Sequence, residues 1–124
     1  MSKKSPITCH VLDTSRGEPA KMLQIRLEKK TSTSSEEPDK NWVLVAVGET
    51  NEDGRCPNLL SAKSPEITEG LYRFTFNTGS YFRNFNKDTF YPYVQIIFEV
   101  TDTTQHYHVP LILSPYSYTT YRGS

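Results

Sequence analysis

The residues of this 124-residue chain best suited to acid–base chemistry are its three histidines, His10, His106 and His108. The imidazole pKa lies near neutrality, so a histidine can both accept and donate a proton at physiological pH. His106 and His108 are two positions apart, and on an extended strand that spacing points both rings to the same side. Ordinary exposed strand residues remain the simplest interpretation of the pair, because the spacing alone does not select catalysis.

Metal binding and anion binding are two further chemistries that these residue types allow. A His-x-His pair on a strand is a possible start of a metal site, but no Cys or carboxylate stands beside it as a third ligand, so we expect no metal. Arg55 follows the dipeptide Asp53-Gly54. Its guanidinium could be a solvated charge at a turn, or it could clamp a planar anion with its fork of donors.

The elements that must position these side chains follow from a period of two. Apolar and polar residues alternate through most of the chain, which predicts strands with one face on a core. We expect seven or eight strands, over residues 7–13, 23–28, 42–47, 72–76, 94–100, 106–113 and 116–121. Only 80–86 is suited to a short helix, 31–40 and 61–68 are polar loops, and Asp53-Gly54 favours a tight hairpin turn. The fold class is therefore all-β, a sandwich or a barrel.

Alternation also assigns the histidines to a face. His10 shares its side of the first strand with Thr8 and Leu12, and His108 lies opposite the apolar set of its own strand. Both histidines should therefore face solvent or another subunit rather than the core. Pro110 follows on the same strand and cannot donate to a ladder, so it predicts a sheet edge, a bulge or a break in pairing near His108.

Composition limits the class of partner. Fourteen Lys and Arg balance fourteen Asp and Glu, so no basic surface is expected for nucleic acid or an acidic membrane. The apolar fraction is 35%, and no segment approaches the length of a membrane span or a secretion signal. Cys9 and Cys56 are too few for a disulfide scaffold, and we expect free thiols, with a bridge as the alternative. A single soluble intracellular domain is expected over 1–124, with residues 1–5 disordered.

Several of these segments resemble one known family, the transthyretin-related 5-hydroxyisourate hydrolases. The stretch 106–115 (HYHVPLILSP) and the terminal tetrapeptide 121–124 (YRGS) are similar to the C-terminal signature of that family. Segments 8–13 (TCHVLD), 53–55 (DGR) and 90–92 (FYP) also match. The resemblance extends from about residue 6 to Ser124, and the tetrapeptide is its most specific part.

The resemblance implies a fold, an assembly and a reaction. The fold would be a transthyretin-like two-sheet β-sandwich. The assembly would be a homotetramer, a dimer of dimers with active sites in a channel at the dimer–dimer interface. The substrate would be a small purine-derived lactam, 5-hydroxyisourate, hydrolysed to 2-oxo-4-hydroxy-4-carboxy-5-ureidoimidazoline. The resemblance implies no metal and no organic cofactor.

The resemblance also implies roles for individual residues. His10 and His108 would share the task of taking a proton from the attacking water. Arg55 would hold the substrate or stabilise the oxyanion that forms. Tyr121 and Ser124 would supply hydroxyls that orient substrate or water, if the tail folds into the channel. The other matched residues are expected to support the site from behind these groups: His106, Arg122 and Gly123.

Two other functions fit the same scaffold. A thyroid-hormone carrier of the transthyretin type would use the same channel, but such carriers resemble this chain with Lys, Glu and Thr in place of His10, Arg55 and His108. A catalytically inactive interaction module is the second alternative. The chain departs from the family at Ile112, Ser117 and Thr119, none of which removes a proposed catalytic group. Similarity to the animal enzymes implies a peroxisomal location, with the cytoplasm as the alternative.

Overall fold

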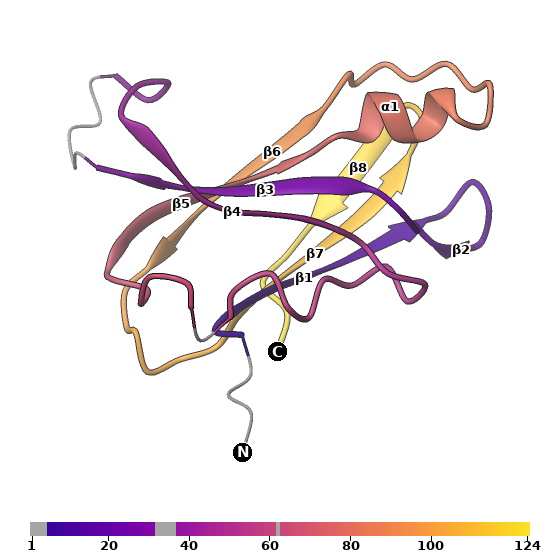
Figure 1. The fold of residues 1–124 in the computed structure, drawn as a ribbon. Coiled ribbons are helices and arrows are strands. Elements are labelled where there is room, and N and C mark those ends of the chain that lie inside the picture. The colour runs from indigo at the N-terminus through magenta and orange to yellow at the C-terminus, as the bar shows by residue number, and fades with distance from the viewer. Residues whose placement is uncertain (1–4, 32–36, 62) are drawn as a thin grey trace.

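Eight strands and one short helix make up the computed structural model, which describes residues 5–31, 37–61 and 63–124 (Figure 1). The elements follow one another along the chain as β1 (Ile7–Asp13), β2 (Glu18–Pro19), β3 (Gln24–Lys30), β4 (Trp42–Glu49), β5 (Gly70–Phe76), α1 (Thr78–Arg83), β6 (Val94–Val100), β7 (Tyr107–Ser114) and β8 (Ser117–Thr120). The strands lie close to the ranges predicted by alternation, and β2 is the additional one.

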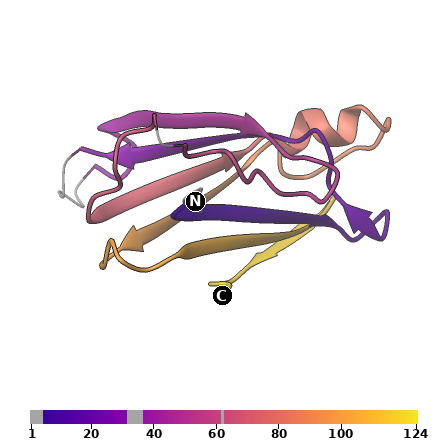
Figure 2. The same cartoon turned by 60° about the horizontal axis from the view of Figure 1, so that its bottom comes forward.

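The strands form two sheets that stack as separate layers (Figure 2). The first sheet has the order β2-β1-β7-β8 and the second has the order β4-β3-β5-β6. This arrangement is a β-sandwich and not a barrel, which confirms the predicted fold class. Among the described residues, no helix is long and apolar enough to cross a membrane.

The core lies between the sheets and is dominated by aromatic residues of the second half of the chain. Tyr72, Phe74 and Phe76 of β5 are fully buried, and so is Phe82 of α1. The buried tyrosine hydroxyls have hydrogen-bond partners, as burial of a polar group requires. For example, the Tyr81 hydroxyl donates to the buried carboxylate of Asp13 over 2.7 Å. This contact ties α1 to the end of β1.

The pairing that matters most for function is the parallel ladder between β1 and β7. Its register places Thr8 opposite His108 and His10 opposite Pro110. The burial pattern of β1 alternates, with Ile7, Cys9 and Val11 in the core and Thr8 and His10 on the outward face. The predicted outward face of the histidines is therefore confirmed, and the two ends of the chain meet on one sheet.

Pro110 is not at a sheet edge, because β7 lies between β1 and β8. The β7–β8 ladder stops at the Leu111–Thr120 pair and resumes only at an isolated bridge between His108 and Gly123. Pro110 lies in the interrupted stretch, where its missing N–H breaks the ladder. Pro110 is also buried, since the C-terminal segment covers this part of the outward face. The predicted break in pairing is confirmed and the predicted margin is wrong.

Two local predictions differ from the structure. The helix begins at Thr78 and ends at Arg83, a little earlier than the predicted range 80–86. The Asp53-Gly54 turn forms, but it closes no hairpin, because the chain leaves β4 and runs beside β1 of the other sheet. A turn sequence fixes local dihedral angles but not the strand that follows.

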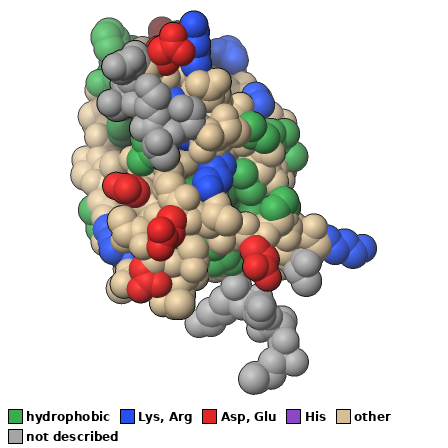
Figure 3. All heavy atoms as spheres, turned by 90° about the vertical axis from the view of Figure 1, so that its left-hand side faces the viewer, with side chains coloured by type: hydrophobic (Ala, Val, Ile, Leu, Met, Phe, Trp, Pro, Cys, Tyr) green, Lys and Arg blue, Asp and Glu red, His purple; other side chains and the backbone are tan. Residues whose placement is uncertain are grey.

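Some predictions fall partly outside the described residues. These are the disordered N-terminal segment at 1–4, the polar loop at 32–36 and the loop position 62. Ser5, the first described residue, is buried, and its hydroxyl donates to the carbonyl of Ile7. The end of the sandwich shown in Figure 3 carries acidic, basic and hydrophobic side chains side by side, consistent with the balanced charge of the chain.

Candidate active site

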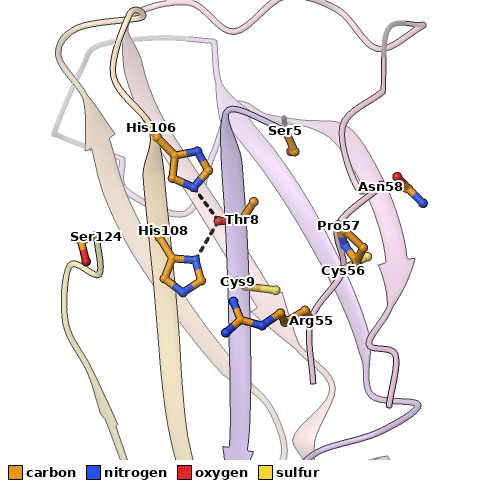
Figure 4. A pocket seen from close by; sticks show the side chains of 10 residues that line it. All are labelled: Ser5, Thr8, Cys9, Arg55, Cys56, Pro57, Asn58, His106, His108 and Ser124. Carbon is orange, nitrogen blue, oxygen red and sulfur yellow. Dashed lines mark hydrogen bonds between the residues drawn. The ribbon is translucent and has the colours of Figure 1, made fainter. Parts of the chain in front are cut away.

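A cavity of about 430 Å³ lies where the start of β1 meets β7 and the loop that follows β4. Its wall includes Thr8, Arg55, His106, His108 and Ser124, contributed by three distant parts of the chain (Figure 4). The wall therefore combines two imidazoles, a guanidinium and two hydroxyl groups, a set of side chains suited to binding and hydrolysing a small polar molecule.

Thr8 links His108 of β7 with His106, which lies just before that strand. Its Oγ1 lies 2.9 Å from His106 Nε2 and 2.7 Å from His108 Nδ1 (Figure 4). The two imidazole rings are nearly parallel, with their centroids 6.4 Å apart. These contacts follow from the β1–β7 register, which places Thr8 directly opposite His108.

The turn after β4 presents Arg55 to the cavity. The side-chain oxygen of Asn51 accepts the backbone N–H groups of Asp53 (2.9 Å) and Arg55 (3.0 Å). The backbone of Asn51 also donates to the carbonyl of Arg55 over 2.7 Å. Such Asx-type hydrogen bonds close a turn on itself. The position of Arg55 is therefore set by its own loop.

Gly54 allows this turn to approach β1. Its φ of +75° lies in the left-handed region, and a Cβ at Gly54 would lie 2.3 Å from the carbonyl oxygen of Val11. Val11 donates its N–H to the Gly54 carbonyl over 2.8 Å, and His10 forms a backbone bridge with Arg55. The close approach therefore places Arg55 beside His10, although His10 is not part of the cavity wall.

The C-terminal segment runs along the outward face of β7. Gly123 donates its N–H to the carbonyl of His108 over 2.9 Å, and Ser124 reaches the cavity wall. Arg122 anchors the segment, since its guanidinium lies 4.7 Å from the centroid of the Tyr107 ring and donates to the Gln105 side chain. The tail is thus ordered by contacts on both sides of Gly123.

The surroundings of His10 and His108 favour neutral imidazoles. Partial burial and the positive charge of Arg55 lower the pKa of His10 below its usual 6.5, against an opposing effect of Asp53. Partial burial, Arg55 and the two other histidines lower the pKa of His108. Both rings are therefore mainly neutral at pH 7, with one N–H and one bare nitrogen that can accept a proton.

The two cysteines line the cavity as thiols. Burial raises the pKa of Cys9 to about 12, and it also raises the pKa of Cys56. Both are free and buried, which agrees with the prediction of unbridged cysteines. A thiol with a raised pKa is a poor nucleophile at neutral pH. Water activated by an imidazole is the better candidate nucleophile in this cavity.

The cavity wall contains half of the eight predicted site residues. Arg55, His108 and Ser124 line the cavity, together with His106. The other four do not line it: His10 lies beside Arg55, Arg122 and Gly123 hold the C-terminal segment on β7, and Tyr121 is 56% exposed. Thr8 was not predicted as a site residue. Its shared face with His10 was visible in the sequence, but its contact with His108 depends on the parallel pairing of β1 and β7.

Comparisons with known proteins match this geometry. The sequence model described as the HIUase/Transthyretin family matches residues 7–123. A mouse protein named 5-hydroxyisourate hydrolase is 46% identical, over 99% of this chain and 98% of its own length. A protein of the same name from Deinococcus radiodurans is 39% identical over the full length of both. The crystal structure of sea bream transthyretin in complex with thyroxine superimposes with a TM-score of 0.84 at 29% identity, covering 96% of this chain and 95% of that one.

Proposed function

The chain belongs to the HIUase/Transthyretin family, and from that membership and the cavity we propose that it hydrolyses 5-hydroxyisourate. The main support is that one cavity is lined by a guanidinium, two imidazoles and a hydroxyl group, from Arg55, His106, His108 and Ser124. Relatives from mouse and from bacteria that align over nearly all of this chain are named for this hydrolysis. The combination suits a planar lactam with several carbonyl groups.

The proposed reaction adds water to a ring carbonyl and opens the ring. A neutral imidazole, that of His108 or His10, takes one proton from the water as its oxygen attacks the carbonyl carbon. Arg55 donates hydrogen bonds to the oxyanion that develops on the carbonyl oxygen. The ring C–N bond then breaks, and the departing nitrogen takes the proton back from the imidazole. Ser124 orients the water or the substrate through its hydroxyl.

A coupled assay tests the proposal directly. Urate oxidase acting on urate generates the unstable 5-hydroxyisourate in a cuvette, and its ultraviolet decay is followed with and without this protein. We expect accelerated decay, reduced about a hundredfold or more in His10→Ala, His108→Asn and Arg55→Ala. Arg83→Ala, which removes an arginine of the helix far from the cavity, is the matched control and should retain activity.

The competing function is tested with the same preparation. Decay at the spontaneous rate would contradict hydrolysis and would favour a binding protein. A thyroxine titration would then be the next measurement, because the sea bream relative was crystallised with thyroxine. Saturable binding of thyroxine by a chain without hydrolase activity would support the carrier function instead.

The expected assembly and location extend this proposal. We propose a homotetramer, a dimer of dimers in which the outward faces of the first sheets line a shared channel. Every residue of β8, one of the two edge strands of the first sheet, is exposed in the single chain, which leaves this edge free to contact another subunit.

We also propose a peroxisomal location, which fluorescence microscopy of the tagged chain beside a peroxisomal marker would test.

A further inference from the structure

Thr8 occupies a position that constrains the protons of both neighbouring histidines. Its hydroxyl oxygen is within hydrogen-bond distance of His106 Nε2 and His108 Nδ1, at 2.9 Å and 2.7 Å. A hydroxyl has one hydrogen and two lone pairs, so it cannot donate to both nitrogens. If both contacts are hydrogen bonds, at least one of these two ring nitrogens must carry a hydrogen.

The orientation of His108 decides which of its nitrogens can react. Nδ1 faces Thr8, so the second nitrogen, Nε2, is the one left to meet water or substrate (Figure 4). A neutral imidazole carries one N–H and one lone pair. If Thr8 donated to Nδ1, the hydrogen of His108 would lie on Nε2, and the ring could not accept a proton from the cavity.

We propose that Thr8 is a positioning residue that sets the tautomer of His108. Its oxygen accepts the Nδ1–H of His108, and its own hydrogen is donated to Nε2 of His106. The lone pair of His108 then lies on Nε2, which takes the proton of the attacking water. This inference rests on the proposed hydrolysis, and it assigns to His106 the task of orienting the Thr8 hydroxyl.

The hydrogen bond between Thr8 and His108 is kept throughout the proposed reaction. When Nε2 of His108 takes a proton from water, Nδ1 still donates to Thr8, so no hydrogen bond has to break. When the ring nitrogen of the substrate departs, the same proton leaves Nε2 and the starting tautomer returns. A hydroxyl acceptor fixed by the strand register therefore serves both protonation states of the imidazole.

Paired substitutions separate the hydroxyl from the shape of the side chain. Thr8→Val keeps the branched shape and removes the hydroxyl, and we expect kcat to fall about tenfold or more with little change in KM. Thr8→Ser restores the hydroxyl and should recover most of the lost rate. Thr75→Val makes the same change on the outward face of the second sheet and should leave kcat unaltered. Wild-type kcat in Thr8→Val would overturn the inference.

Nitrogen NMR of the ¹⁵N-histidine-labelled protein tests the tautomer without reference to activity. At neutral pH we expect His108 to show a protonated Nδ1 and an unprotonated Nε2, and we expect Thr8→Val to lose this preference. A protonated Nε2 with a bare Nδ1 in the wild type would overturn the inference. Absence of hydrolysis by the wild type would instead contradict the proposed function, while the NMR result would still report the tautomer.

Discussion

Burial, and after it the positive charge of Arg55, set the pKa of the imidazoles at the scale of single residues. Arg55 lowers the pKa of both His10 and His108, in addition to the effect of burial. A lowered pKa keeps each ring neutral at pH 7 and limits how far the pH can fall before the base is lost. In the proposed reaction the guanidinium would therefore have two roles, holding the substrate and keeping the base neutral.

The rate of hydrolysis should consequently resist mild acid. Protonation removes the lone pair that accepts the proton of water, so kcat/KM falls as pH falls through the pKa of the base. Because that pKa is lowered from 6.5, the midpoint of the acidic limb should lie below pH 6.5. A pH–rate profile of the free enzyme measures it, and a midpoint above 6.5 would contradict a neutral imidazole base.

Removing the charge of Arg55 should reverse part of this lowering of the pKa, while the effect of burial remains. In Arg55→Gln the pKa of His10 and that of His108 should both rise, since the opposing positive charge is gone. Arg55→Lys keeps the charge and is the matched control, in which both pKa values should stay below 6.5. Proton NMR titration of the ring signals reports each pKa without requiring activity. Unchanged values in Arg55→Gln would refute the assigned electrostatic cause.

Gly123 is the second residue on which the site depends. A Cβ there would lie 2.5 Å from Cδ2 of His108 and 3.1 Å from Pro110, closer than packed atoms tolerate. Gly123→Ala should displace the tail or the imidazole and lower kcat by about tenfold to a hundredfold. Gly17→Ala adds a methyl group in open space, and because its φ of +66° strains a side chain, any cost should appear in stability and not in activity. An unaffected Gly123→Ala would show that the close contact between the tail and His108 is not needed for activity.

Candidate site residues could be predicted from the sequence where they belong to a recognisable motif. They could not be predicted where only the pairing of distant strands places them at the site. The tetrapeptide resemblance identified Ser124, and strand alternation placed His10 and His108 off the core. Thr8 has no such signal, because its partner is a hundred positions away in the chain. Pro110 correctly predicted a break in the β-ladder. Its burial could not be predicted, because the alternation of strand residues does not show that the C-terminal segment covers it.

At the scale of elements, alternation predicted the strands well and the connections poorly. Periodicity reports which face of a strand is buried, but it says nothing of which strand lies beside it. The Asp53-Gly54 sequence therefore suggested a hairpin, whereas Asn51 closes the turn and directs the chain toward β1. The helix limits shifted because strand alternation carries no signal for the start of a short helix, and Asn77, a residue type common at N-caps, was not used to set it.

The contact between α1 and β1 should contribute measurably to stability. Asp13 is buried and accepts hydrogen bonds from the Tyr81 hydroxyl and from the N–H and hydroxyl of Ser15. Tyr81→Phe removes a donor to a buried carboxylate and should cost about 1.5–3 kcal/mol of the free energy of unfolding. Urea denaturation measures this cost. Ser15→Ala, at an exposed position, should cost less, and equal losses would argue against burial as the reason.

At the scale of the whole molecule, the edges of the two sheets point to assembly. β8 ends the first sheet and β6 ends the second, and both present exposed large apolar or aromatic side chains, among them Tyr118 and Ile97. An exposed strand edge has unpaired backbone groups that favour pairing with another chain.

The mass in solution checks the proposed tetramer. Light scattering coupled to gel filtration should give four times the 14.2 kDa of one chain. Tyr118→Lys places a charge on the exposed edge strand β8 and should shift the mass toward smaller species. The matched change Val43→Lys on β4, an edge strand of the other sheet, should leave the mass unaltered. A monomeric wild type would contradict the tetramer.

The parallel ladder between β1 and β7 has a consequence for how a ribosome makes this protein. β3, β4, β5 and β6 pair only with one another, so the second sheet can close while synthesis is still under way. β1 emerges first but has to wait for β7, with Ile7, Cys9 and Val11 uncovered. The cavity is completed only after residues 106–124 have left the exit tunnel. A ribosome-bound nascent chain should therefore have its second sheet paired, while the first sheet and the cavity are incomplete and the chain is inactive.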